Sequence, residues 1–354
     1  MKIKKLSYMS SLILVLVIVG LMVVAGCAPT PAPEVTEWRI QSCFPRGDIT
    51  ADGLTYFAER VEERSNGRLK VEAFAEPEIV PVTETLPACT TGAIDMAGGA
   101  GAVWSMVVPC ADVYFGGLPR IWYSPDLSVK EGALFQRKFL SESGAVEIIR
   151  DEFAKHNIYW LDMSTAGSVC CLTTKEAHTL DDIKGRKIAD LGGWMSRWNA
   201  ALGWTPVEML PGSEVEMGLR LGTIDAVLWG QDAMTSLHWN EAAPYWISNE
   251  WLVTHILQDL LVNMDSWNAL PDDLKQVVED AADDYFWQQI DAFTAQQKEV
   301  YRMVAAGEVT ENLMDEEYQR QADKEAYKLW DQAAAEDPAS AELIRLIKEA
   351  RGIA

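Results

Sequence analysis

The sequence predicts an α/β protein with two lobes of similar build, followed by a helical C-terminal region. Three observations lead to this expectation. Apolar segments with strand patterns alternate with amphipathic helical segments over residues 37–229. A tetrapeptide near the end of the first half recurs at the matching place in the second half. From Pro271 onward the apolar residues keep only a helical spacing.

The first half begins with a segment in which Trp38, Ile40 and Phe44 stand among polar residues, as in a half-buried strand. A turn at 45–48 leads into a helix that Asn66 and Gly67 end, since both tolerate the left-handed conformation. The expected elements are strands at 37–44, 69–73 and 94–97, a helix through 54–61, and a short helix near 82–91 that contains Pro87.

The second half repeats this plan. Thr179 is a candidate cap for a short helix, and Ser213 with Glu216 forms the S-x-x-E pattern of a capping box. Glycines at 185, 203 and 222 end the helices. The expected elements are strands at 187–191, 205–210 and 224–229, and helices at 181–184, 194–202 and through Leu221.

The internal repeat consists of residues 92–95 (GAID) and 222–225 (GTID), each between a helix and a strand. In both places glycine suits the end of a helix, isoleucine enters the sheet, and aspartate stands near the start of the strand. The C-terminal region then predicts helices at 271–293, 314–336 and 339–350, with a short extended stretch at 309–310.

The N-terminus has the pattern of a secretory signal peptide. Lys2, Lys4 and Lys5 precede an apolar run at 12–24, and small residues lead to Cys27. We expect cleavage after residue 26, a lipid on the Cys27 sulfur, and a proline-rich tether at 27–36. An uncleaved anchor is the alternative, but the run is short for a bilayer span. Both interpretations place the protein outside the cytoplasm.

The composition excludes some classes of partner. The formal net charge of the whole chain is −23, and removal of the three lysines of the signal peptide takes it to −26. Nucleic-acid binding needs a basic face, so we expect none. Five cysteines remain beside Cys27, and because their number is odd at least one thiol is free. We expect buried free thiols at Cys43, Cys89, Cys110, Cys170 and Cys171.

Signatures of catalysis are absent from the sequence. The four histidines lack the H-x-x-x-H spacing, and neither a nucleophile elbow nor a phosphate-binding loop occurs. We therefore predict no enzyme, no cofactor and no metal site. A two-lobed exported α/β protein without catalytic motifs fits a binding protein whose lobes close on a solute.

Ligands of open α/β sheets bind beyond the carboxyl ends of strands, so the residues that follow strands are the site candidates. Phe44 and Arg46 follow the first strand, and Trp104 follows the glycine run at 98–101. Trp229 ends the last strand, where a platform for the ligand and core packing are equally good interpretations. Trp194 and Arg197 lie on one predicted helix, and an outward-facing arginine is the alternative for Arg197. Gln231 and Asp232 lie in the following loop, where exposed loop polarity is the alternative.

Several segments together resemble the solute-binding proteins of tripartite ATP-independent periplasmic (TRAP) transporters. They are 57–71 (FAERVEERSNGRLKV), 179–188 (TLDDIKGRKI), 202–207 (LGWTPV), 210–215 (LPGSEV) and 221–226 (LGTIDA), and the similarity covers most of 37–290. It implies a two-lobed periplasmic-binding-protein fold of type II-like build, with a long bridging helix and C-terminal helices. It also implies delivery of a small organic solute to a small and a large membrane permease subunit, driven by an ion gradient.

The resemblance implies lobe I at 37–166 plus about 255–294, and lobe II at 167–254 plus about 295–354. It also exposes a difference. The arginine that holds an organic acid in this family would follow Ile188, where Ala189 and Asp190 stand, and a second would lie near Cys170. Leu228 replaces a family glutamate, while Trp229 is kept.

The absent arginines bear on the ligand, because alanine or valine cannot make a bidentate pair with a carboxylate. We therefore expect a neutral or weakly charged organic molecule, or an acid held in another way. A ligand-sensing protein of a membrane receptor and, less so, an exported hydrolase are the alternative functions.

Overall fold

A five-stranded sheet carries the first half of the chain in the computed structural model, which describes residues 35–123, 126–208, 211–248 and 255–353. Its strand order is β2-β1-β3-β10-β4. The first strand pairs with the third in parallel, and β10 pairs antiparallel with β3 and β4. The strands are β1 (Thr36–Pro45), β2 (Leu69–Glu76), β3 (Met96–Gly99), β4 (Ile158–Thr165) and β10 (Leu257–Asn263).

A six-stranded sheet carries the second half, in the order β11-β9-β5-β8-β6-β7. Strands β6, β7 and β8 run parallel, and β5 pairs antiparallel with β8 and β9. The chain therefore passes between the sheets from β4 to β5 and again from β9 to β10. The strands are β5 (Val169–Thr173), β6 (Lys187–Asp190), β7 (Thr205–Glu208), β8 (Ala226–Gly230), β9 (Tyr245–Ile247) and β11 (Thr310–Asn312).

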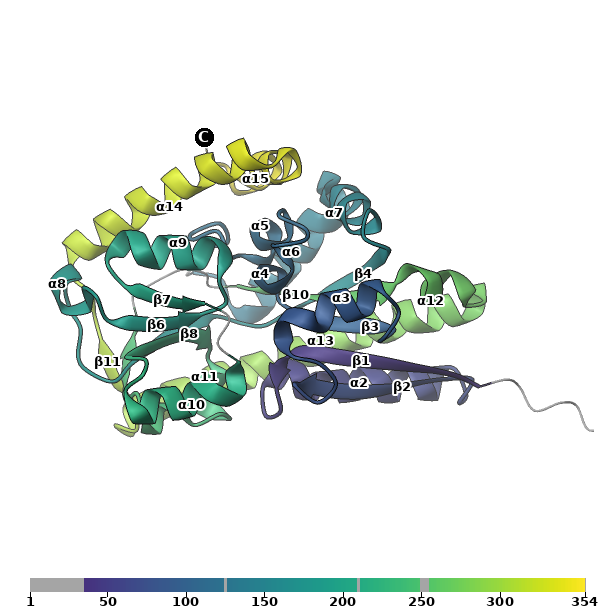
Figure 1. Cartoon of the computed structure of the whole chain (residues 1–354), viewed down its shortest axis with the longest axis horizontal. Helices are drawn as coiled ribbons and strands as arrows, with labels where there is room; N and C mark the ends of the chain where they lie inside the picture. The colour runs from purple at the N-terminus through teal and green to yellow at the C-terminus, as the bar shows by residue number, and fades with distance from the viewer. Residues whose placement is uncertain (1–34, 124–125, 209–210, 249–254, 354) are drawn as a thin grey trace, which may run out of the picture. The chain divides into compact units, whose positions relative to one another are not determined.

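Helices surround both sheets (Figure 1). In the first half they are α2 (Ile49–Arg64), α3 (Thr85–Thr90), α4 (Gly101–Trp104), α5 (Ala111–Phe115), α6 (Val129–Ser143) and α7 (Ala145–Ala154). In the second half they are α8 (Leu180–Ile183), α9 (Gly193–Leu202), α10 (Gly212–Leu221), α11 (Asp232–Thr235) and α12 (Met264–Ala269). Short 3-10 turns, η1 (Val82–Glu84) and η2 (Trp239–Glu241), complete the connections.

The long helix α13 (Asp272–Ala305) contacts β4, α2 and α6 of the first half and α11, which follows β8, of the second, as expected of the bridging helix that the resemblance implied. Near its middle, the Tyr285 hydroxyl donates to the Thr50 carbonyl at 3.3 Å, at the beginning of α2. Near its end, Gln296 donates to the Thr235 hydroxyl at 3.3 Å, at the end of α11. The helices α14 (Glu316–Glu336) and α15 (Pro338–Arg351) follow; α14 packs on α9, and α15 packs on α5, α6 and α7.

The internal repeat is confirmed in its hydrogen bonds. The amides of Ala93 and Ile94 both donate to the Ala88 carbonyl, and those of Thr223 and Ile224 both donate to the Gly218 carbonyl. The aspartate side chains that follow then accept from the backbone of the neighbouring strand. Asp95 accepts from the Arg39 amide at 2.9 Å, and Asp225 accepts from the Lys187 amide at 2.9 Å.

Three sequence predictions are changed by the structure. The third strand begins at Met96, because Ile94 and Asp95 are still part of the turn. The capping box of Ser213 and Glu216 is wrong, since α10 begins at Gly212 and no side chain caps it. The sequence pattern predicts no elements at 101–165, where the structure has α4 to α7 and β4. The capping of α8 by Thr179 and the five buried free thiols are confirmed.

Candidate functional site

A cavity of about 30 Å³ lies where the carboxyl ends of β1 and β8 meet. Its apolar wall includes the rings of Phe44, Phe115, Trp229 and Phe293. Its polar side chains are those of Asp48, Thr50, Asp232 and Gln258. In this conformation the cavity has room for about two water molecules. A mostly apolar wall with a few polar groups is typical of small-molecule sites.

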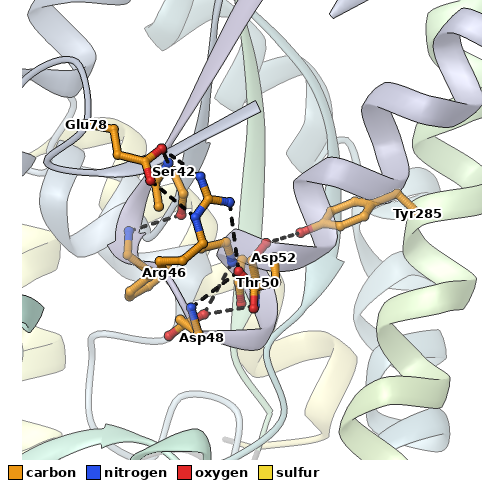
Figure 2. A network of polar contacts seen from close by, with 11 residues as sticks. Ser42, Arg46, Asp48, Thr50, Asp52, Glu78 and Tyr285 are labelled. Atoms are coloured by element: carbon orange, nitrogen blue, oxygen red, sulfur yellow. Dashed lines mark hydrogen bonds and ion pairs between the residues drawn. The ribbon is translucent and has the colours of Figure 1, made fainter. Parts of the chain in front are cut away.

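Asp48 is placed by the turn that follows β1. It caps α2, where its Oδ1 accepts from the Thr50 amide at 2.8 Å, and its side chain is buried. Figure 2 shows this network, with the Tyr285 hydroxyl of α13 holding the Thr50 carbonyl from the other side. A carboxylate at the N-terminus of a 16-residue helix is stabilised by the helix dipole.

Trp229 joins the two sheets at the cavity. Its indole Nε1, at the end of β8, donates to the Asp48 Oδ2 at 3.3 Å. Its ring meets the Phe44 ring edge to face, with centroids 5.5 Å apart, and the Trp239 ring at 5.2 Å. These contacts hold the indole in one orientation, so the wall is fixed in shape.

Asp232 begins α11, directly beyond β8, and only 2% of its surface is exposed. Its Oδ2 has no hydrogen-bond partner. Burial raises the pKa of this carboxyl well above its usual range, and the charge of Asp48 and a hydrogen bond with Asp48 raise it further. A Cβ at Gly230 would meet Asp232 Oδ1 at 2.2 Å, so glycine is needed for this approach.

Gln258 reaches the cavity from β10, and its side chain is 3% exposed. Its Oε1 is buried and has no hydrogen-bond partner. A buried acceptor without a donor costs about 1–3 kcal/mol. The cavity therefore holds two unsatisfied acceptors, on Asp232 and Gln258, that a ligand with donors would satisfy.

Three of the predicted site residues, Phe44, Trp229 and Asp232, line the cavity. Arg46 lies outside the lining: its guanidinium donates to Glu78 at 2.6 Å and lies 3.9 Å from Asp52 (Figure 2). Arg197 stacks over the Trp194 ring at 4.2 Å and pairs with Glu336 at 2.8 Å, also outside the lining.

The remaining predicted residues serve local structure. Asp190 accepts from the Gly192 amide at 2.9 Å, from Asn199 at 2.7 Å and from the Ser196 hydroxyl, which shapes the turn into α9. Cys170 donates to the Gly230 carbonyl at 3.3 Å. Trp104 is fully buried. Gln231 precedes α11 without a side-chain cap, next to Asp232, which lines the cavity.

Trp194 takes part in a contact beside the cavity. Its backbone amide, at the start of α9, donates to the Asp112 carboxylate of α5 at 2.8 Å. Burial raises the pKa of Asp112 to about 7, although the hydrogen bond from Trp194 opposes this shift. A Cβ at Gly193 would meet Asp112 Oδ2 at 2.2 Å. This contact joins a helix of the first half to one of the second.

Sequence reasoning missed Asp48, Gln258, Phe115 and Phe293. Asp48 carried a signal, because an aspartate after a strand and before a helix is a favoured cap. Gln258 and Phe115 lie in segments to which no element was assigned. Phe293 was placed on the right helix, but its approach to the cavity depends on how α13 packs.

The predicted signal peptide, Cys27 and most of the tether lie outside the described residues. In the part of the chain that the structure describes, no helix is both long and apolar enough to cross a bilayer. No group of three or more potential metal-ligating side chains occurs there either.

Comparisons with known proteins place this geometry in a family. The model of the bacterial extracellular solute-binding proteins, family 7, matches residues 41–337. A monocarboxylate 2-oxoacid-binding periplasmic protein of Nostoc sp. is 27% identical over 308 residues, which is 86% of this chain and 80% of that protein.

Solved structures of TRAP solute-binding proteins share the fold. One from Bordetella bronchiseptica, with calcium and picolinate in its site, has a TM-score of 0.80 at 20% identity and covers 90% of this chain and 92% of its own. One from Chromohalobacter salexigens, with bound (S)-(+)-2-amino-1-propanol, has a TM-score of 0.79 at 19% identity and covers 90% and 96%. They confirm the predicted two-lobed α/β fold.

The match of the family model runs through both sheets, the long helix and the residues of the cavity. The extracytoplasmic location that the N-terminal sequence predicts agrees with this family match. The chain belongs to the bacterial extracellular solute-binding proteins of family 7.

Proposed function

We propose that this protein is the solute-binding subunit of a TRAP-type secondary transporter. It captures a small organic solute in the cavity and delivers it to a small and a large membrane permease subunit. The observation that carries the proposal is the cavity at the ends of β1 and β8, which combines an aromatic wall with unsatisfied buried acceptors. It has the features of a binding site, and we propose no enzymatic activity.

We propose that the lobes comprise 37–166 with about 255–294, and 167–254 with about 295–354. The sheet membership of β1 to β4 and β10, against β5 to β9 and β11, supports this division. The proposed division assigns α15 to the second lobe. In the structure, however, α15 packs on α5, α6 and α7, which belong to the first lobe. Closure of the two lobes would bury the solute against Phe44 and Trp229.

We propose further that residues 1–26 are removed and that a lipid on Cys27 holds the protein at the membrane. The pattern of basic residues, apolar run and small residues before Cys27 supports this. Metabolic labelling with a palmitate analogue tests it. The wild-type protein should take up the label and Cys27→Ala should not, whereas equal labelling of both would contradict the anchor.

The ligand proposal starts from what relatives bind and what this chain lacks. The Nostoc relative binds monocarboxylate 2-oxoacids, and the Chromohalobacter structure holds an amino alcohol. Here Ala189 and Cys170 stand where carboxylate-binding arginines were expected, and Arg46 and Arg197 are engaged elsewhere. We propose a neutral or weakly charged organic solute, held against Phe44 and Trp229.

A thermal-shift screen of small metabolites, followed by calorimetry, tests the function. A ligand at 100 times its dissociation constant adds about 2.7 kcal/mol to the stability of the folded state. Trp229→Ala should weaken binding of the solute that emerges. If no compound of any charge class binds, or if a bound compound is turned over, the proposal fails. Uptake by vesicles that contain the permease subunits separates transport from receptor sensing.

A further inference from the structure

The charges of the cavity are all of one sign. Among the described residues that line it, the ionisable side chains are Asp48 and Asp232, and no lysine, arginine or histidine is present. The nearest arginine candidate, Arg46, is held by Glu78 and Asp52 at the surface. An organic anion would therefore enter a site with two buried carboxyls and no cation to oppose them.

The two carboxyls belong to different halves of the chain. Asp48 comes from the loop after β1, and Asp232 from the loop after β8. They lie close enough for one to share a proton with the other. The charge of one carboxyl disfavours ionisation of the other, and a positive charge beside them would relieve this repulsion. A cationic ligand supplies that charge and also joins the two halves.

A second and independent observation points to a donor-bearing ligand. Asp232 Oδ2 and Gln258 Oε1 are both buried and have no hydrogen-bond partner. Asp232 is 2% exposed and Gln258 is 3% exposed, and both line the cavity. An ammonium group carries up to three donors and accepts nothing, which matches acceptors that lack donors.

The walls fit an organic cation better than a metal ion. Calcium prefers six to eight oxygen ligands, and the described residues hold no cluster of three acidic or other metal-ligating groups. The wall consists largely of aromatic rings, including Phe44, Trp229 and Phe293. Rings attract ammonium groups through their faces and offer no ligand oxygen to a metal. The formal net charge of −23 would also attract cations over a distance.

Taking these observations together, we propose that the solute is a small organic cation, whose ammonium group binds between Asp232 and Asp48 with Gln258 Oε1 as a further acceptor and Phe44 and Trp229 as the aromatic wall. This inference rests on the proposed function and narrows its ligand from a neutral or weakly charged solute to one that carries a single positive charge. Asp232 is the residue that selects the charge, and Gln258 is the one that distinguishes an ammonium with N–H groups from a fully methylated one.

The test uses calorimetry on the full-length chain, purified in detergent, with small metabolites in three charge classes. At its centre are three compounds of nearly the same shape: 1-amino-2-propanol, propane-1,2-diol and lactate. Amines should bind, with 1-amino-2-propanol at least tenfold tighter than the diol or lactate. If neutral compounds or anions bind as tightly as the amines, or if Na⁺ or Ca²⁺ binds and the amines do not, the inference is overturned while solute binding stands. If nothing binds, the proposed function falls with it.

Two variants test whether Asp232 is the residue that makes the site prefer amines. Asp232→Asn keeps the shape of the side chain and should weaken amine binding by about 10- to 100-fold, as expected for a hydrogen bond to a charged group. Asp52→Asn removes an acid that is half exposed and lies outside the cavity, and it should leave affinity unchanged. Equal affinities in wild type and Asp232→Asn would overturn the inference.

Gln258→Met removes the amide oxygen at similar volume. It should weaken binding of a primary amine more than binding of choline, which has no N–H groups to donate. An equal loss of affinity for the primary amine and for choline would show that Gln258 does not accept a hydrogen bond from the ammonium group. Circular dichroism of each variant shows whether the fold is kept, and the charge series on the wild-type protein tests the inference without any variant.

Discussion

At the scale of single residues, Trp229 has two roles that can be separated. Its ring forms part of the cavity wall, and its Nε1 donates to Asp48 Oδ2 at 3.3 Å. The second role fixes the orientation of a carboxyl that belongs to the other sheet.

Trp229→Phe keeps an aromatic ring and removes the donor. We expect solute affinity to fall about fivefold, which corresponds to roughly 1 kcal/mol for one hydrogen bond. Trp229→Ala removes the wall as well and should cost more. Calorimetric titration measures both, and Trp287→Phe, at a half-exposed position on α13, is the matched control. Equal affinities for Trp229→Phe and wild type would show that the indole nitrogen is not needed.

Asp259, on β10, predicts how stability depends on pH. Its Oδ1 accepts from the Tyr114 hydroxyl at 2.9 Å and from the Trp160 indole at 2.7 Å, yet burial raises its pKa to about 7. The folded state therefore keeps this proton up to about pH 7, whereas the unfolded chain releases it near pH 4. Its contribution to the free energy of unfolding is full below about pH 4 and is lost as the pH rises to about 7.

Asp259→Asn removes this titration. Between pH 4.5 and 7 the free energy of unfolding of the wild type should fall more steeply than that of the variant, by up to roughly 1.4 kcal/mol per pH unit. Urea denaturation across this range measures the two slopes. Parallel slopes would contradict the raised pKa, even if the variant is less stable throughout.

At the scale of elements, the repeated turns at 92–95 and 222–225 show how one local pattern builds both halves. Each turn returns two amides to one helical carbonyl and then uses an aspartate to fasten the neighbouring strand. Gly222 has a φ of +70°, and a Cβ there would meet nothing within 4 Å. A side chain at position 222 therefore causes no steric clash, and its effect on stability comes from the strain of the left-handed backbone conformation alone.

Gly222→Ala should destabilise the protein by about 1 kcal/mol, because a left-handed alanine is strained. Gly222→Asn should cost less, since asparagine tolerates that conformation. Thermal unfolding ranks the two variants, and solute affinity should stay constant because the turn lies outside the cavity lining. The reverse order of stabilities would contradict the conformational argument.

These elements also show which parts of the fold were accessible from sequence. Strand β1 alternates only at its start, around Trp38 and Ile40, and β2 alternates over its first five residues. This period of two predicted strands at 37–44 and 69–73, and β2 runs on to Glu76. Strands β5 and β10 are buried along their whole length and carry no alternation. Helix α6 had its signal in the Ser128 and Glu131 capping box, which the structure contains. The Ser213 pattern failed because Pro211 and Gly212 already begin α10.

At the scale of the whole molecule, the start of α9 meets α5 through the Asp112 carboxylate and the Trp194 amide. Gly193 permits this approach, with a φ of +61° and no side chain to displace Asp112. In the proposed two-lobed arrangement this contact forms when the lobes close.

Gly193→Ala should disfavour closure. Fewer molecules would then be in the closed, binding-competent state, and the apparent solute affinity should fall in proportion to that fraction. X-ray scattering with the same solute should give a larger radius of gyration for the variant than for the wild type. Gly144→Ala is the matched control, because Gly144 has a similar positive φ but open space around it. If both variants bind alike, the contact does not control closure.

The site was predictable only in part, because some of its residues are brought to the cavity by contacts between distant parts of the chain. Phe44 and Trp229 follow strands whose order is readable from local patterns, so they were found. Gln258 and Phe293 reach the cavity through strand pairing and the packing of α13, which join residues more than a hundred positions apart. Arg197 was a reasonable substitute for the absent arginines, but Glu336 of α14 holds it at the surface.

The five buried thiols affect how the protein folds after export and how it is refolded in the laboratory. Burial raises the pKa of Cys43, Cys89 and Cys110, so that in the native state these sulfurs are poor nucleophiles. In an oxidising compartment the native packing is thus their only shield against oxidants. A chain that arrives unfolded, or unfolds briefly, exposes sulfurs that can cross-link wrongly, which favours rapid folding after export and refolding under reducing conditions.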